Sequence, residues 1–284
     1  MENININWFP GHMAKAHRMI REHLKLVDVV IELLDARIPY SSANPVISEV
    51  IGEKPRIVVL NKSDLAESDW TEKWAEHFRS QSLPVVAVEA ITGKGTKQLV
   101  SQVEHLAKDK IAKMVAKGIN PRAVRAMILG IPNVGKSSLI NRLLGTATVR
   151  TADKPGVTRG KQWIKISRNL ELLDTPGVLW PKFEDPEVGF KLAVTGAIND
   201  DVYDMEKVVL GLLDILRVNY SQRLIERYNL ISPLPEETVA LLELIGSKRG
   251  CLRSGGVIDY EKAYRMILNE FRSGKLGPFT LDWI

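Results

Sequence analysis

Residues 126–138 read Ala-Met-Ile-Leu-Gly-Ile-Pro-Asn-Val-Gly-Lys-Ser-Ser, an apolar run that leads into a loop bounded by Gly130 and Gly135. A helical pattern follows at once. Glycine at these two positions lets the backbone curl so that its amides and the first helical turn face an anion. Lys136 would then reach the terminal phosphates of a nucleotide, and Ser137 would offer a hydroxyl to Mg²⁺. An ordinary glycine-rich turn is the alternative, which the flanking strand and helix disfavour. The loop residues expected to contact the nucleotide are Asn133, Val134, Gly135, Lys136, Ser137 and Ser138.

A second motif follows about forty residues downstream, where the predicted strand Leu170–Leu173 leads into Asp174-Thr-Pro-Gly177. An acidic residue at a strand end suits a carboxylate linked to Mg²⁺, and the Gly177 amide suits a contact with the γ-phosphate. On its own, this sequence is typical of a common turn. Downstream of a phosphate loop, it favours a second nucleotide-binding motif. In the polar segment between the two motifs, Thr158 is the candidate for a second hydroxyl ligand of Mg²⁺. The alternative is that Thr158 is a plain loop residue.

A base-reading motif precedes the phosphate loop in the chain. The predicted strand Arg56–Leu60 ends in Asn61-Lys62-Ser63-Asp64. The Asp64 carboxylate can accept both the N1 and N2 hydrogens of guanine, a pairing that adenine cannot offer. Lys62 is expected to lie along the base plane, and Asn61 to tie this loop to the phosphate loop. A capped turn is the alternative interpretation. After the next strand, Ala90 is a weaker candidate for a backbone contact with guanine O6.

The hydrophobic pattern predicts an α/β fold, because short apolar runs alternate with helical patterns up to about residue 173. Two final strands joined by a polar turn predict an antiparallel hairpin at the sheet edge. From about residue 200 only helical patterns remain. We therefore expect a domain of residues 1–199 that begins with a basic helix, followed by a small all-helical domain of residues 200–284. The expected strands are 27–34, 56–60, 84–88, 126–129, 162–166 and 170–173; the expected helices are 12–26, 69–80, 96–115, 139–144, 202–228, 235–244 and 260–271.

Composition narrows the class of protein. The chain of 284 residues has one cysteine, Cys251, which argues against a disulfide framework and favours the cytoplasm. No apolar run is long enough to suggest a membrane span. Residues 200–284 hold 11 basic and 13 acidic residues, whereas residues 1–199 hold 28 and 21, so the positive charge lies upstream. It is densest in 108–125 and 150–168, which either face a polyanion or simply solvate helices.

The motif order resembles the circularly permuted GTPases, in which the base-reading half precedes the phosphate-reading half. Within them, the opening Trp8-Phe9-Pro10-Gly11-His12-Met13 and the later Asp35-Ala36-Arg37 look like the ribosome biogenesis GTPase A (YlqF) family. The resemblance covers nearly the whole chain. It implies a P-loop GTPase domain with a mainly parallel sheet, GTP and GDP as ligands with Mg²⁺, and a cytoplasmic role in maturing the large ribosomal subunit. Contact with ribosomal RNA is implied as well.

The residue that would activate water for hydrolysis is not evident from the motifs. Many small GTPases place a glutamine after the glycine of the Asp174 motif, but here Val178 and Leu179 follow. The polar group must come from elsewhere or from a partner, and the resemblance points to His12, although a lone histidine is often structural. Lys136 is the other catalytic candidate. Similar GTPases with asparagine at the position of Asn133 use it to help coordinate K⁺, so K⁺ dependence is a hypothesis.

Three functional classes remain open at this stage. The leading one is a GTP-hydrolysing assembly factor for the precursor of the large (50S) subunit, expected to be a monomer. The second is a GTP-regulated RNA- or ribosome-binding module in which hydrolysis is incidental, and the third, a membrane-associated GTPase, is disfavoured by the missing apolar span. In the helical domain, RNA contact would fall to basic residues among glycines and on the last helix, unless these only solvate the surface. They are Lys248, Arg249, Arg253, Arg265 and Arg272.

Overall fold

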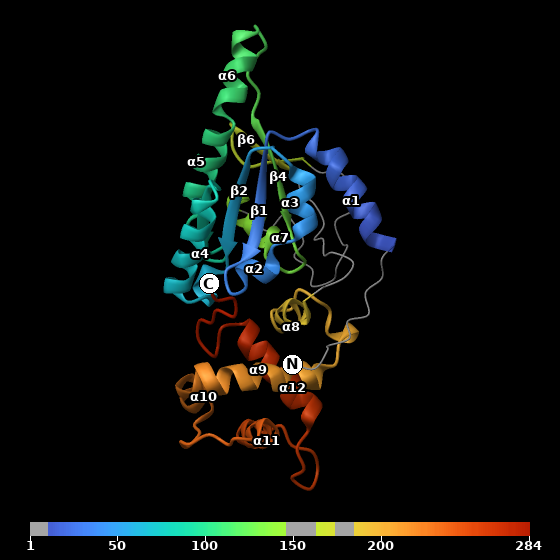
Figure 1. Cartoon of the computed structure of the whole chain (residues 1–284), viewed down its shortest axis with the longest axis vertical. Coiled ribbons are helices and arrows are strands. Elements are labelled where there is room, and N and C mark those ends of the chain that lie inside the picture. The colour runs from blue at the N-terminus through green and yellow to red at the C-terminus, as the bar shows by residue number, and fades with distance from the viewer. Residues whose placement is uncertain (1–10, 146–162, 174–184) are drawn as a thin grey trace. The chain divides into compact units, whose positions relative to one another are not determined.

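The computed structural model describes residues 11–145, 163–173 and 185–284 (Figure 1). Within these residues the chain forms two compact units. We call residues 11–145, 163–173 and 279–284 the sheet unit, and residues 185–278 the helical unit. The domain boundary predicted after residue 199 stays a prediction.

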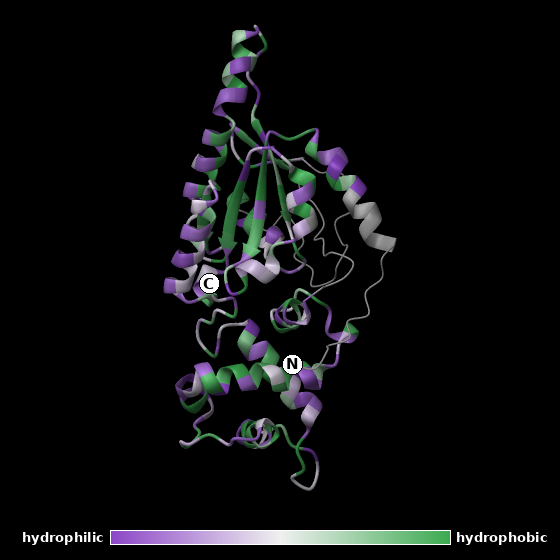
Figure 2. Ribbon diagram, in the orientation of Figure 1, coloured by the Kyte–Doolittle hydropathy of each residue, from purple (hydrophilic) through white to green (hydrophobic). Residues whose placement is uncertain are grey.

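The sheet unit is built on a six-stranded sheet with the order β3-β2-β1-β4-β6-β5. Every neighbouring pair among the described strands is parallel except β5 and β6, which form the predicted antiparallel hairpin. The central strand β1 is buried along its whole length, as its apolar sequence predicts. Figure 2 shows the apolar character of these central strands. The strands are β1 Val29–Asp35, β2 Arg56–Asn61, β3 Val85–Val88, β4 Val124–Gly130, β5 Trp163–Lys165 and β6 Leu170–Leu173.

Helices pack against this sheet through two hydrophobic cores. Ile20 of α1 and Ile47 of α3 belong to one core, with Met127 and Leu129 of β4. The second core joins Trp74 of α4 to Val58 and Leu60 of β2. Burying one large aliphatic side chain contributes about 1.5–3 kcal/mol, so these two cores hold the sheet in place. The helices are α1 Gly11–Leu24, α2 Pro39–Ser42, α3 Pro45–Ile51, η1 Ser63–Leu65, α4 Ser68–Ser80, α5 Thr96–Leu106, α6 Lys108–Ala116 and α7 Lys136–Leu144.

The helical unit packs its helices around leucine, valine and phenylalanine side chains. Aspartates cap three of the helices by accepting backbone amides in the first turn, which satisfies donors that a helix start leaves open. Arg272 donates to the carbonyls of Ala193 and Val194 at the end of α8 and pairs with Asp200. The elements are α8 Pro186–Val194, η2 Asp200–Val202, α9 Met205–Asn219, α10 Ser221–Tyr228, α11 Thr238–Lys248 and α12 Tyr260–Arg272.

Several element predictions were wrong in detail. The helix expected over 202–228 divides into α9 and α10 at Tyr220, whose φ of −139° and ψ of 31° are not helical. The helix expected over 96–115 divides at Ala107 into α5, which buries Leu99 and Val103, and α6, which buries none of its side chains. Helices α2, α3 and α8 were not expected. Arg272, proposed as an RNA contact, is engaged inside the helical unit.

In the described part of the chain, none of the helices combines the length and the apolar character needed to cross a membrane.

Candidate functional site

The candidate site lies where the carboxyl ends of β1, β2 and β4 meet. The pairing of Asp35 with Asn61, and of Leu33 with Gly130, brings the loops after these strands to one edge of the sheet. Chain connections run from β1 through β2 to β3 in one direction, whereas β4 lies on the other side of β1. Such a switch point leaves a crevice where parallel sheets bind ligands.

The phosphate loop needs both of its glycines. A Cβ atom on Gly130 would lie 2.6 Å from the Leu33 carbonyl oxygen, and one on Gly135 would lie 2.3 Å from Asn61 Nδ2. Gly135 also has a φ of +102° and immediately precedes α7. The backbone can therefore pass closely over β1 and β2 only with glycine at these positions.

Lys136 and the start of α7 make the loop positive. The buried Lys136 Nζ donates to the carbonyl oxygens of Gly130 and Ile131, at 3.0 and 2.7 Å. Its ammonium is thus held within the curve of the loop. Ser137 and Ser138 stand in the first turn of α7, where free backbone amides and the helix dipole favour an anion.

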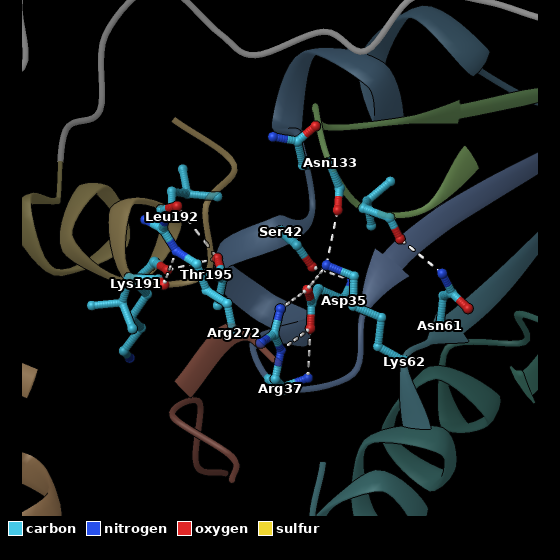
Figure 3. Close-up of polar contacts among 12 residues, drawn as sticks. Asp35, Arg37, Ser42, Asn61, Lys62, Asn133, Lys191, Leu192, Thr195 and Arg272 are labelled. Carbon is cyan, nitrogen blue, oxygen red and sulfur yellow. Dashed lines mark hydrogen bonds and ion pairs between the residues drawn. The ribbon is translucent and has the colours of Figure 1, made fainter. Parts of the chain in front are cut away.

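Asn61 joins three loops. Its Nδ2 donates to the Val134 carbonyl oxygen at 2.8 Å (Figure 3). Its Oδ1 accepts the Ala90 amide at 3.2 Å. The predicted tie between the base-reading loop and the phosphate loop is therefore present. The Ala90 carbonyl oxygen in turn accepts Arg142 Nε of α7 at 3.2 Å, a contact that the sequence did not indicate.

Lys62 makes a second tie between the two loops. Its backbone is left-handed, with a φ of 58°, at the start of η1. Its Nζ donates to the Asn133 carbonyl oxygen at 2.8 Å and to Asp35 Oδ2 at 2.9 Å. Figure 3 shows this side chain between β1 and the phosphate loop. Two residues along, the Asp64 side chain is exposed to solvent.

Asp35 is the buried centre of this arrangement. Besides Lys62, it accepts Arg37 Nε at 2.9 Å and an Arg37 terminal nitrogen at 2.7 Å. Burial by itself would raise the pKa of the Asp35 carboxyl, but the charges of Arg37 and Lys62 outweigh it and hold that pKa well below its usual range. Asp35 is therefore a permanent anion that orients both cations. In the sequence, Asp35-Ala36-Arg37 was noted only for its family resemblance. The signal that could have indicated its role is an acidic residue at the end of a buried strand.

Several predicted site residues lie outside the described part of the chain. They include Thr158, Asp174 and Gly177. His12 lies in helix α1, but its side chain is not among those described. Their roles stay predictions. Among the described residues, no group of three histidine, cysteine or acidic side chains could hold a metal ion. The magnesium site expected at Ser137, Thr158 and Asp174 stays a prediction.

Comparison with known proteins finds relatives that match nearly the whole chain. Residues 125–237 match the family model described as "50S ribosome-binding GTPase". A protein of Priestia megaterium named Ribosome biogenesis GTPase A is 53% identical over 280 residues, which cover 98% of this chain and 97% of that one. The crystal structure titled "GNP-bound YlqF from T. maritima" has a TM-score of 0.64 and 26% identity, covering 94% of this chain and 97% of that chain. The GDP-bound structure of YlqF, also 26% identical, has a TM-score of 0.62 and covers 93% and 98%.

Proposed function

The chain belongs to the ribosome biogenesis GTPase A family, and from this premise we propose that it is a GTP-hydrolysing factor in late maturation of the large (50S) ribosomal subunit. The observation that carries the proposal is the joining of two loops at the β1 and β4 switch point. Asn61 and Lys62 reach from the base-reading loop to the carbonyls of Val134 and Asn133 in the phosphate loop. One nucleotide could therefore meet both loops at once.

We assign the parts of GTP to these two loops. The loop amides, the start of α7 and Lys136 Nζ would hold the phosphates, since they present positive charge at one place. The exposed Asp64 would accept the N1 and N2 hydrogens of guanine, and Ala90 would contribute its backbone near O6. The selection of GTP over ATP would follow from Asp64.

Among the described residues, Ser137 is the donor that we assign to a hard cation bound together with the phosphates. Ser137 stands in the first turn of α7, where a hydroxyl can reach a cation shared with the β- and γ-phosphates. Thr158 and Asp174 would complete the protein's part of a Mg²⁺ site. When bound, Mg²⁺ supplies positive charge that offsets the charge developing on the phosphates.

Hydrolysis requires a group that orients water, and we assign this role to His12 or to a partner. Val178 and Leu179, which follow Gly177, have apolar side chains that cannot hold a water. Asn133 is exposed on the phosphate loop, where its side chain could help to coordinate K⁺. We further propose contact with ribosomal RNA, a monomeric state and a cytoplasmic location.

The test is GTP hydrolysis by the purified protein alone and with 50S particles, in K⁺ and in Na⁺ at equal ionic strength. Stimulation by particles that His12→Ala abolishes, with GTP binding intact, would support a ribosome-activated GTPase. Without stimulation, the alternative of a GTP-regulated ribosome-binding module would be favoured. Equal rates in K⁺ and Na⁺ would refute the K⁺ hypothesis.

A further inference from the structure

Residues Phe279–Ile284 belong to the sheet unit, although the preceding residues belong to the helical unit. Phe279, Thr280, Leu281 and Asp282 are all buried. We call these six residues the 279–284 segment. A short segment that buries an aspartate and a threonine needs hydrogen bonds for both. Those bonds end at the two stretches of chain that flank the site.

The first set of contacts fixes the turn that carries Asp64. The Phe279 amide donates to the Leu65 carbonyl oxygen at 2.9 Å. Thr280 Oγ1 accepts the Glu67 amide at 3.3 Å. Leu65 is the residue directly after Asp64, so the segment holds the far side of the base-reading turn.

The second set fixes the stretch that follows β1. The Leu281 amide donates to the Arg37 carbonyl oxygen at 2.8 Å. The Asp282 carboxylate accepts the Ser41 amide at 2.7 Å and the Ser41 hydroxyl at 2.8 Å. From the other side, Trp74 Nε1 donates to the Asp282 carbonyl oxygen at 3.0 Å.

These two sets converge on the base-reading loop. Arg37, whose carbonyl the segment contacts, also pairs with Asp35, and Asp35 holds Lys62 at the near side of the turn. Lys62 adopts a left-handed backbone, which for a residue other than glycine persists only when its surroundings fix it. The segment therefore acts on both sides of Asp64.

We propose that the 279–284 segment positions the base-reading loop and thereby sets how long a guanine nucleotide stays bound. The proposal rests on the assignment of Asp64 to guanine made above. A loop already ordered in its binding geometry loses less conformational entropy when the ligand arrives, and the gain falls mainly on the dissociation rate. Asp282 and Thr280 are positioning residues, since neither would touch the nucleotide.

The test compares full-length Asp282→Ala with wild type by stopped-flow release of fluorescent GDP and by affinities for GDP and IDP. IDP lacks the 2-amino group that Asp64 would bind. We expect GDP release to accelerate about tenfold, and the preference for GDP over IDP to fall. A general loss of structure would weaken the binding of GDP and of IDP by the same factor.

Asp28→Ala is the matched control. Asp28 is a buried carboxylate just before β1, at the opposite edge of the sheet, where it accepts Arg122 at 2.7 and 2.9 Å and the Arg125 amide at 2.9 Å. Its loss should lower the melting temperature without changing GDP release. Thr280→Val removes the hydroxyl that accepts the Glu67 amide and should accelerate release about twofold to threefold, which keeps the test open if Asp282→Ala does not fold.

The outcomes separate the inference from the assignment beneath it. Unchanged release and an unchanged GDP preference in both variants of the segment would overturn the inference, as would equal weakening of GDP and IDP. A wild-type protein that binds GDP and IDP equally, and that Asp64→Ala leaves unaffected, would instead overturn the base-reading assignment.

Discussion

Replacing Asp35 by alanine should destabilise the sheet unit more than any surface change. Its side chain is 2% exposed and that of Arg37 is 1% exposed, so the substitution removes the carboxylate that pairs with a buried guanidinium. Breaking a buried pair from one side costs about 3–5 kcal/mol. In a domain of this size, 1 kcal/mol lowers the melting temperature by about 2–4 °C. We therefore expect Asp35→Ala to melt about 6–20 °C below wild type.

The assay is thermal unfolding followed by circular dichroism in the absence of nucleotide. Arg79→Ala is the control, since Arg79 and Glu72 form a pair whose side chains are 52% and 62% exposed. Such surface pairs contribute about 0–1 kcal/mol. Asp35→Asn keeps an acceptor for Arg37 and should fall between the two. If Asp35→Ala melted no lower than Arg79→Ala, the Asp35 cluster, formed by Asp35, Arg37 and Lys62, would not have the structural role inferred from its burial.

Three further predictions concern base reading, the phosphate loop and the helical unit. Asp64→Asn should bind GTP more weakly and xanthosine triphosphate more tightly, because the O2 atom of xanthine can accept a hydrogen bond from the new amide. Titration with both nucleotides tests this, and an unchanged preference would exclude Asp64 from base reading. Gly135→Ala should weaken GDP at least about tenfold, because its Cβ would lie 2.3 Å from Asn61 Nδ2, whereas Gly118→Ala, at a positive φ with nothing within 4 Å, should bind GDP normally. Burial raises the pKa of Glu270, but its two arginine partners hold it at about 2 against an ordinary 4.5. The stability that Glu270 contributes is thus present above pH 4.5 and lost as the pH falls towards 2, so the melting difference between wild type and Glu270→Gln should close over that range; a constant difference would contradict the pairing.

The phosphate loop and the sheet around it were predictable because their signals are local. A glycine-bounded loop between an apolar run and a helical pattern fits in a few residues, and the structure places it between β4 and α7. The tie from Asn61 to the phosphate loop followed from motif chemistry as well. Parallel order followed from the alternation of apolar runs with helices.

The contacts that align the site were not predictable, because they join residues far apart in the chain. Ser41 and Asp282 are 241 residues apart, and nothing in the sequence of either indicates the other. The break between α9 and α10 was missed for a different reason, since both sides carry the same helical period. Only tertiary packing decides such a case.

Motif order makes these long-range contacts necessary. The base-reading loop and the phosphate loop are joined along the chain through β3, α5 and α6, and Figure 1 places α6 beyond the opposite edge of the sheet. The covalent path therefore does little to align Lys62 with Asn133. Alignment comes instead from the register of β1 with β2 and β4, and from the Asp35 cluster at the end of β1. A nucleotide that meets both loops would then bind an arrangement set by packing, and changes in that packing would alter its affinity without touching it.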